Sequence, residues 1–187
     1  DLTIRGGLLG ASYLEFNGSS EYAESASFAD DRSVANDADY TIEFWFKKTT
    51  SLSANHYLFD LYNGSNNNNR SFARVKSSNG ALMWGSYNNS AGEHPNLSTT
   101  TTGLHDNKWH HVAFVHYGTG GAFSGTYAKG AKAIYLDGKL DAFVEGGDGG
   151  ATWCQYTQGT SMTLTLGRDA SDDNEYFAGC LDEIRIW

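Results

Sequence analysis

Side chains of alternating polarity are the feature of this chain that most limits its possible folds. Ile42, Phe44 and Phe46 occupy every second position of the segment Tyr40–Lys47. Successive side chains of a strand point to opposite faces, so this period of two predicts a strand with one face in a core. The segment Trp109–Tyr117 shows the same period. Since no segment shows the longer period of an amphipathic helix, we expect an all-β fold.

Turn-forming residues separate further strands along the whole chain. The pair Asp137-Gly138 divides Ala133–Val144 into two apolar runs, and this pair favours the positive φ angles of a tight hairpin turn. Many short strands with short turns are typical of an antiparallel sandwich or barrel. No linker or internal repeat interrupts the pattern, so residues 1–187 are predicted to form a single domain. The other predicted strands are Tyr13–Phe16, Tyr57–Tyr62, Phe72–Lys76, Ala81–Tyr87, Met162–Leu166 and Phe177–Trp187.

The chain is acidic and rich in uncharged polar residues. Its net charge at pH 7 is −9, and because such a surface repels phosphate backbones, nucleic acid is not an expected partner. No apolar run approaches the ~18 residues that cross a bilayer, so no membrane insertion is predicted. Charged residues make up only 19% of the chain, and Asn, Ser, Thr and Gly take their place. This composition and a start at Asp1 indicate an extracellular or cell-surface protein, or a module tethered to neighbouring domains.

Two cysteines, Cys154 and Cys180, complete the composition. In an exported protein they are expected to form a disulfide. Closing a loop of this length would stabilise the fold by about 3 kcal/mol on the chain-entropy model. Two free thiols are the alternative.

A loop dense in carboxylates and amides follows the predicted strand Met162–Leu166. It contains Asp169, Asp172, Asp173 and Asn174. Oxygen ligands gathered on one loop suit a hard cation, above all Ca²⁺. Carboxylates packed together repel one another unless a cation neutralises them, which favours a metal site. The alternative is an acidic loop that water solvates.

Several segments, in order along the chain, resemble one known family. They are Leu14–Tyr22 (LEFNGSSEY), Tyr40–Phe46 (YTIEFWF), Trp109–Ala113 (WHHVA), Tyr135–Lys139 (YLDGK) and Leu166–Ile186, which ends in FAGCLDEIRI. Together they resemble the laminin G-like and pentraxin-like domains of the concanavalin A-like lectin/glucanase superfamily. The resemblance implies a jelly roll of two antiparallel sheets that serves as a binding module, often with Ca²⁺ and often for sugars. The spacing of Cys154 and Cys180 also resembles the C-terminal disulfide of laminin G domains.

The resemblance further implies two calcium sites. In pentraxin-like members, one site joins the loop after Leu-Gly to an Asp/Asn loop between two earlier strands. Here these loops supply the candidate ligands Asp169, Asp172, Asp173, Asn174, Asn66 and Asn68. Ser171 stands where an acid is expected, and the second loop has no carboxylate. The other, structural site of concanavalin A-like folds implies Asp182 and Asn17 as ligands, with a salt bridge from Asp182 to Arg185 or another strand as the alternative.

Aromatic and arginine side chains near the loops are the candidates for sugar binding, which needs flat apolar faces beside fixed polar groups. The aromatic residues would be platforms, and the arginines would donate to hydroxyls or to a carboxylate. These ligand-binding candidates are Trp84, Tyr87, Trp153, Tyr156, Arg70 and Arg74. Each aromatic side chain alternatively covers a sheet face. Trp45 and Trp109 are expected to be packing residues, and Trp187 is expected to close the last strand.

Catalysis is not predicted. Retaining glycosidases need two carboxylates about 5–5.5 Å apart, and related glucanases present them on an E-x-D-x-x-E strand. The chain has no such strand: Glu43 is followed by Phe-Trp-Phe, and the adjacent Asp182 and Glu183 face opposite sides of a strand. For the same reason His110 and His111 do not readily share a zinc ion.

The function expected from the sequence is calcium-dependent carbohydrate binding by a lectin-like module of an extracellular adhesin or secreted enzyme. Its partners would be cell-surface or matrix glycans. A calcium-dependent adhesion module that binds an exposed peptide at the same rim is the first alternative. The second alternative is a structural spacer domain in which calcium only stabilises the fold.

Overall fold

The computed structural model describes residues 3–5, 12–25, 39–49, 53–62, 70–88, 92–93, 96–117, 131–144 and 163–187; for residues 3–5, 87–88 and 92–93 it describes the backbone alone. The regular secondary structure of these ranges consists of β-strands alone. None of these residues forms a helix that is long and apolar enough to cross a membrane.

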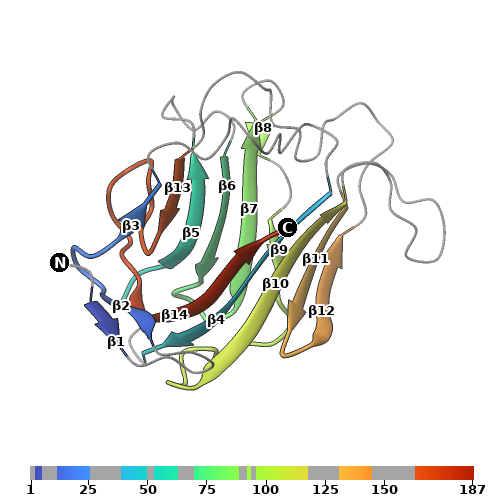
Figure 1. Cartoon of the computed structure of the whole chain (residues 1–187). Helices are drawn as coiled ribbons and strands as arrows, with labels where there is room; N and C mark the ends of the chain where they lie inside the picture. Colours follow the sequence, from blue (N-terminus) through green and yellow to red (C-terminus); the bar gives the residue numbers. More distant parts are fainter. Residues whose placement is uncertain are drawn as a thin grey trace.

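The described strands form two antiparallel sheets (Figure 1). Sheet A has the order β1-β2-β14-β4-β10-β11-β12. Sheet B has the order β3-β13-β5-β6-β7-β8, and β9 also pairs with β7. The strands are β1 (Thr3–Arg5), β2 (Tyr13–Asn17), β3 (Ala23–Glu24), β4 (Tyr40–Lys48), β5 (His56–Tyr62), β6 (Arg70–Val75), β7 (Leu82–Asn88), β8 (Gly92–Glu93), β9 (Leu97–Ser98), β10 (Trp109–Tyr117), β11 (Ala131–Leu136), β12 (Lys139–Val144), β13 (Thr163–Leu166) and β14 (Ala178–Ile186).

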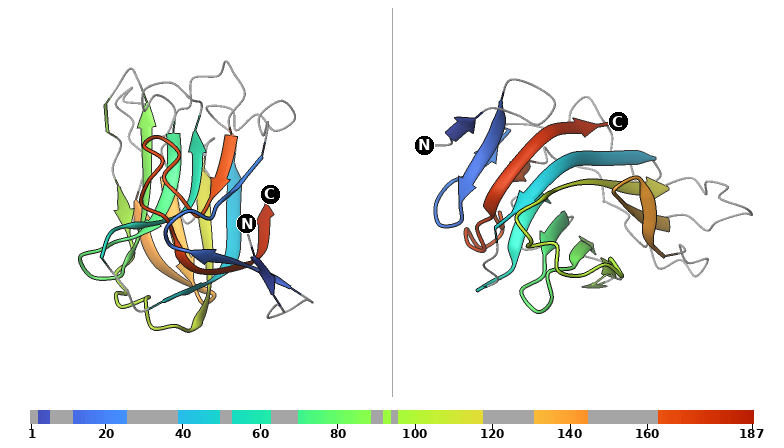
Figure 2. Two further views of the ribbon diagram at one scale, coloured as in Figure 1. Left: turned by 90° about the vertical axis from the view of Figure 1, so that its left-hand side faces the viewer. Right: turned by 90° about the horizontal axis from the view of Figure 1, so that it is seen from below.

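The two sheets pack face to face, with sheet A curving over sheet B (Figure 2, right). Strand β4 shows how the alternating sequence produces the core: Ile42, Phe44 and Phe46 are buried, whereas the side chains between them are partly exposed. Phe44 meets Phe59 of sheet B edge to face, with ring centroids 6.3 Å apart. The predicted two-sheet antiparallel β-sandwich is therefore confirmed.

The predicted hairpin joins β11 and β12. Its turn residues Asp137 and Gly138 have φ angles of 49° and 77°, and Leu136 pairs with Lys139 across the turn. Positive φ at both central positions is the geometry that matches the twist of the two strands.

Strand β14 lies inside sheet A, between β2 and β4. It pairs with both neighbours in antiparallel register, and a bulge interrupts its pairing with β4 between Asp182 and Arg185. The closing segment of the family resemblance is thus a central strand that connects two strands from early in the chain.

The loop between β13 and β14, residues 167–177, turns back across the outer face of sheet B (Figure 2, left). We call it the acidic loop. Its ends meet at Gly167, whose N–H donates to the carbonyl of Leu58 at 3.2 Å and whose carbonyl accepts from the N–H of Phe177 at 2.8 Å. Gly167 has a φ of +86°, and a Cβ there would lie 2.6 Å from the ring of Phe16. Only glycine fits this position without strain.

Replacing Gly167 with alanine combines an unfavourable φ with a clash in the core. Gly103 is the matched control, because its φ is +73° but a Cβ there would meet no atom within 4 Å. We expect G167A to lower the free energy of unfolding by about 1–3 kcal/mol more than G103A, which is the cost of overpacking. Urea titrations of both variants measure the difference, and equal losses would contradict the close packing of the acidic loop against Phe16.

Candidate ligand-binding face

The outer face of sheet B carries a cluster of arginine and aromatic side chains. Every second side chain of β5, β6 and β7 points away from the core. The register pairs Tyr57 with Arg74 and Arg74 with Met83, and it pairs Asp60 with Phe72. The rings of Tyr57 and Phe72 stack with their centroids 5.2 Å apart. We call this cluster the arginine face; it comprises Tyr57, Asp60, Arg70, Phe72, Arg74 and Met83.

Arg70 connects the arginine face to the acidic loop. Its Nε donates to Oδ1 of Asp60 at 2.9 Å, and its Nη2 donates to Oδ2 of Asp60 at 2.7 Å and to Oδ1 of Asp169 at 2.6 Å. Its Nη1 donates to Oγ of Ser171 at 2.9 Å. The guanidinium also lies 4.6 Å from the ring centroid of Phe72, within cation–π range. Arg70 is 4% exposed, so these protein groups replace the water that a guanidinium otherwise binds.

Burial and the charge of Arg70 act in opposite directions on the two carboxylates. Asp60 is fully buried, and burial raises its pKa to about 6, although the hydrogen bonds from Arg70 and from the N–H of Ala170 act to lower it. Burial also acts to raise the pKa of Asp169, but the charge of Arg70 and the hydrogen bonds from Ser171 outweigh it and hold this pKa below its usual value. Both carboxylates are therefore largely ionised at pH 7, and one guanidinium lies between them.

The acidic loop does not present its carboxylates to a common metal ion. Asp169 points inward to Arg70, and Asp173 points outward and pairs with Arg168 at 2.7 Å. Of the other predicted ligands, Asp172 and Asn174 are exposed, and Asn66 and Asn68 lie outside the described residues. Within the described ranges, no three His, Cys, Asp or Glu side chains are grouped to hold a metal ion. The described candidate ligands do not fit the predicted calcium site, because the carboxylate of Asp169 already accepts from Arg70 and Ser171.

The structure does not bring together the two ligands predicted for the second calcium site, Asn17 and Asp182. Asn17 pairs with Ala178 of β14, and Asp182 lies roughly 13 Å further along that strand. The side-chain oxygen of Asn17 accepts instead from the N–H groups of Ser19 and Ser20, at 2.9 and 3.0 Å. This residue therefore closes the turn after β2.

Strand β14 carries two further sequence predictions. Oδ1 of Asp182 accepts from the N–H of Glu183 at 2.9 Å, and Arg185 pairs with Glu183 and Glu43. Cys180 is buried as a free thiol, and burial raises its pKa. Cys154 lies outside the described residues, and its disulfide with Cys180 stays a prediction that this structure does not show.

The prediction that Trp84 is an exposed platform is wrong. Trp84 is fully buried on the core face of β7, where its Nε1 donates to Oγ of Ser71 at 2.9 Å and its ring meets Phe114 edge to face. The physical reason is the alternation along β7: Met83 points outward, so the next side chain points into the core. Tyr87 is described by its backbone alone, and Trp153 and Tyr156 lie outside the described residues.

Arg74 lies on the same face as Arg70, but its hydrogen bonds are longer and weaker. Its Nη1 donates to the hydroxyl of Tyr57 at 3.3 Å and to Oε2 of Glu175 at 3.4 Å, both long contacts. Its Nη2 lies 3.9 Å from the sulfur of Met83, a weak acceptor, and its Nε is buried with no hydrogen-bond partner among the described residues. The side chain is 25% exposed. The exposed part of this side chain is therefore available to a ligand.

The sequence pattern identifies the two arginines but not the acids that distinguish them. Asp60 does leave a signal, because it is the single charged residue of the segment Tyr57–Tyr62, and a carboxylate in a buried strand needs a charged partner. Glu175 leaves no such signal, since its contact with Arg74 depends on the path of the acidic loop.

Two antiparallel sheets packed face to face define a β-sandwich of the jelly-roll class. The chain belongs to the Concanavalin A-like lectin/glucanases superfamily, whose family model matches residues 17–187. The family resemblance seen in the sequence is therefore confirmed. No curated protein is similar enough in sequence to match the chain.

Solved structures with the same fold include three domains that bind other molecules. The Ruminococcus gnavus IT-sialidase CBM40 bound to alpha2,3 sialyllactose has a TM-score of 0.62 and 15% identity, over 92% of this chain and 89% of that chain. Domain 4 of AbnA, a GH43 extracellular arabinanase from Geobacillus stearothermophilus, in complex with arabinotriose, has a TM-score of 0.62 and 18% identity, over 100% and 74%. The binding domain of botulinum neurotoxin DC in complex with rat synaptotagmin II has a TM-score of 0.62 and 14% identity, over 100% and 41%. At these identities the likeness shows the fold alone.

Replacing Arg70 with methionine would leave Asp60 and Asp169 without their cation. We expect R70M to lower the free energy of unfolding at pH 7 by about 3–5 kcal/mol, the cost of breaking a buried ion pair. R185M is the control, because Arg185 is exposed and such pairs contribute roughly 0–1 kcal/mol. Urea titrations measure both variants, and wild-type stability of R70M would refute the role of Arg70.

Calcium provides a separate test of the acidic loop. Because the carboxylate of Asp169 already accepts from Arg70 and Ser171, we expect the same melting temperature in millimolar Ca²⁺ and in excess chelator. A calcium ion at 100 times its Kd would instead add about 2.7 kcal/mol to stability. Circular dichroism melting curves measure the difference, and a higher melting temperature in Ca²⁺ would support the sequence-predicted site and point to ligands outside the described residues.

Proposed function

We propose that this protein is a carbohydrate-binding module and that the arginine face holds the glycan. The observation that carries the proposal is Arg74, a partly exposed cation whose Nη1 contacts are long and whose buried Nε has no partner among the described residues. A buried donor without an acceptor costs about 1–3 kcal/mol. A ligand oxygen at the exposed part of the side chain would accept a shorter, charged hydrogen bond than the protein supplies.

The groups around Arg74 suit the oxygen atoms of a sugar. The planar guanidinium donates two parallel hydrogen bonds, which match a carboxylate or a pair of neighbouring hydroxyls. Glu175, whose side chain is about as exposed as that of Arg74, offers acceptor oxygens to a hydroxyl. Asn55 holds Glu175 in place through a hydrogen bond of 2.8 Å. Donors and acceptors therefore lie side by side on this face.

The structural neighbours support this proposal, since two of them are solved with sialyllactose and arabinotriose. One of these neighbours is a domain of an extracellular arabinanase. We accordingly propose an extracellular setting, a place beside other domains and a role in binding rather than catalysis. We also infer that glycan binding at this face needs no calcium ion, because Arg70 supplies the positive charge that orders the acidic loop.

A peptide is the second candidate ligand, because one neighbour binds rat synaptotagmin II. Arg74 would donate hydrogen bonds to a peptide carboxylate as readily as to a sugar carboxylate. Screening the wild-type protein on a glycan array and on a peptide array separates the two classes.

Replacing Arg74 with methionine removes the guanidinium and keeps an unbranched side chain. We expect R74M to weaken binding of the glycan found on the array by roughly tenfold or more, the loss of a charged hydrogen bond of about 1.5–3 kcal/mol. R74K keeps the charge but not the fork, so we expect its affinity to lie between those of R74M and the wild type. Isothermal titration calorimetry with α2,3-sialyllactose, arabinotriose and the array ligand measures these affinities.

Arg70, on the same strand, is the matched comparison for Arg74. R74M should keep nearly the stability of the wild-type protein, whereas the main effect of R70M should be a loss of stability. Wild-type affinity in R74M would show that the glycan binds elsewhere.

A further inference from the structure

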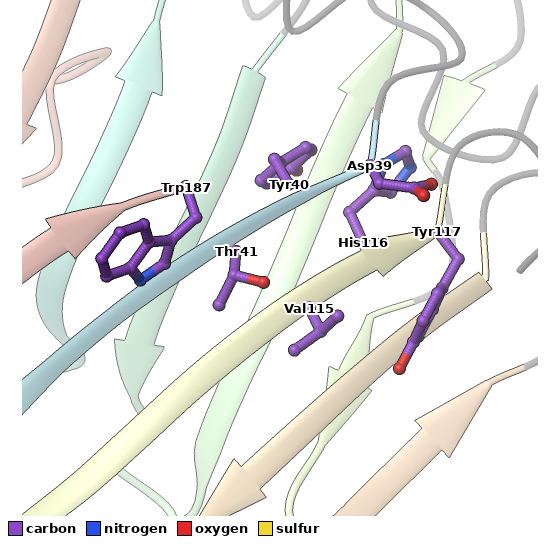
Figure 3. Close-up of a pocket in the computed structure, with 7 residues that line it drawn as sticks. All are labelled: Asp39, Tyr40, Thr41, Val115, His116, Tyr117 and Trp187. Carbon is purple, nitrogen blue, oxygen red and sulfur yellow. The ribbon is translucent and has the colours of Figure 1, made fainter.

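A cleft lies on the other side of the sandwich, on the outer face of sheet A (Figure 3). Its volume is about 230 Å³. Thr41 of β4 and Val115 of β10 lie at its floor, and Trp187 and Tyr117 stand on either side of them. Asp39 lies at the end near Tyr117. This cleft shares no residue with the arginine face.

Trp187 is both exposed and held in place. Its side chain is 67% exposed, yet its Nε1 donates to Oε1 of Glu43 at 3.1 Å. Its backbone pairs with Thr41 through two hydrogen bonds of 3.0 and 3.2 Å. Figure 3 shows the indole beside β4. Because the polar N–H is already satisfied, the exposed part of the ring is apolar and rigid.

The chemistry of the cleft matches one sugar ring. A hexopyranose has an apolar face of C–H groups and a rim of hydroxyls, so it combines stacking on an aromatic ring with hydrogen bonds at its edge. Here Trp187 offers the stacking surface, and Thr41 and Asp39 offer a hydroxyl and a carboxylate. The volume is below the roughly 300–1,000 Å³ of pockets for drug-sized ligands, which suits one monosaccharide unit.

A protein partner fits this surface less well. The charged side chains of Glu43 and Arg185 lie beside the indole, 3.8 Å apart. The exposed large hydrophobic side chains of the described residues are Tyr22, Leu140 and Trp187, from three different parts of the fold. Protein interfaces use a continuous apolar patch of several hundred Å², and these residues do not form one.

We propose that this cleft is a second carbohydrate site, which binds a single hexopyranose ring stacked by its C–H face on Trp187. The hydroxyls of the sugar point toward Thr41, whose backbone pairs with that of Trp187. The site acts independently of the arginine face, since the two lie on the outer faces of opposite sheets.

Nuclear magnetic resonance on the whole chain tests the cleft with defined probes: methyl β-galactoside, methyl β-glucoside and N-acetylglucosamine. For at least one probe, we expect a saturable shift of the Trp187 indole N–H and an upfield shift of the sugar C–H protons, which stacking over an aromatic ring produces. W187A should weaken this binding by about tenfold or more, and Y117A should weaken it less. L140A is the control, because Leu140 is 45% exposed and lies outside the cleft.

The variants also separate this site from the arginine face. R74M should leave the Trp187 shift unchanged, and W187A should leave binding at the arginine face unchanged. Loss of the Trp187 shift in R74M would show a single site and overturn the proposal. No shift with any probe up to the limit of solubility, or a W187A variant that binds like the wild type, would overturn it as well.

Discussion

The guanidinium of Arg70 lies between the buried carboxylates of Asp60 and Asp169 and holds the acidic loop against the outer face of sheet B. Asp60 belongs to β5, Arg70 to β6 and Asp169 to the acidic loop, so their ion pairs fix three separate segments. Removing charges from water costs several kcal/mol per ion, and only the complete set of partners offsets that cost. Ser171 belongs to the same set, and its hydroxyl suits Arg70 where a further carboxylate would add negative charge. The acidic loop is therefore organised by a cation from the chain itself.

Strand β6 uses the alternation of its side chains to give two arginines different roles. Arg70, Phe72 and Arg74 share one face, and both guanidinium groups lie near the stacked rings of Tyr57 and Phe72. Arg70 is saturated by protein groups, whereas Arg74 makes only long contacts and is partly exposed. Since its neighbours already hold Arg74, a ligand would bind with a small loss of side-chain entropy.

The sheets follow from the sequence more readily than the site does. In β4 each apolar residue is followed by a polar or half-exposed one, so the pattern itself shows which side faces the core. In β7 the residues Leu82, Met83 and Trp84 are all apolar, and such a run does not say which face is buried. The roles of Arg70 and Arg74 depend on pairing across the fold: Asp169 lies 99 residues from Arg70 along the chain. Local patterns carry no information about such contacts.

The central place of β14 in sheet A has a consequence for how the protein folds. Thr49, directly after β4, bonds to Ala178 of β14 across 129 residues of chain. During synthesis, the edges of β2 and β4 that pair with β14 therefore stay unpaired until β14 leaves the ribosome. Sheets built from such distant strands fold slowly, on the scale of milliseconds to seconds, and their open edges can pair with other chains meanwhile. A nascent chain of this protein is thus most exposed to aggregation just before its central strand arrives.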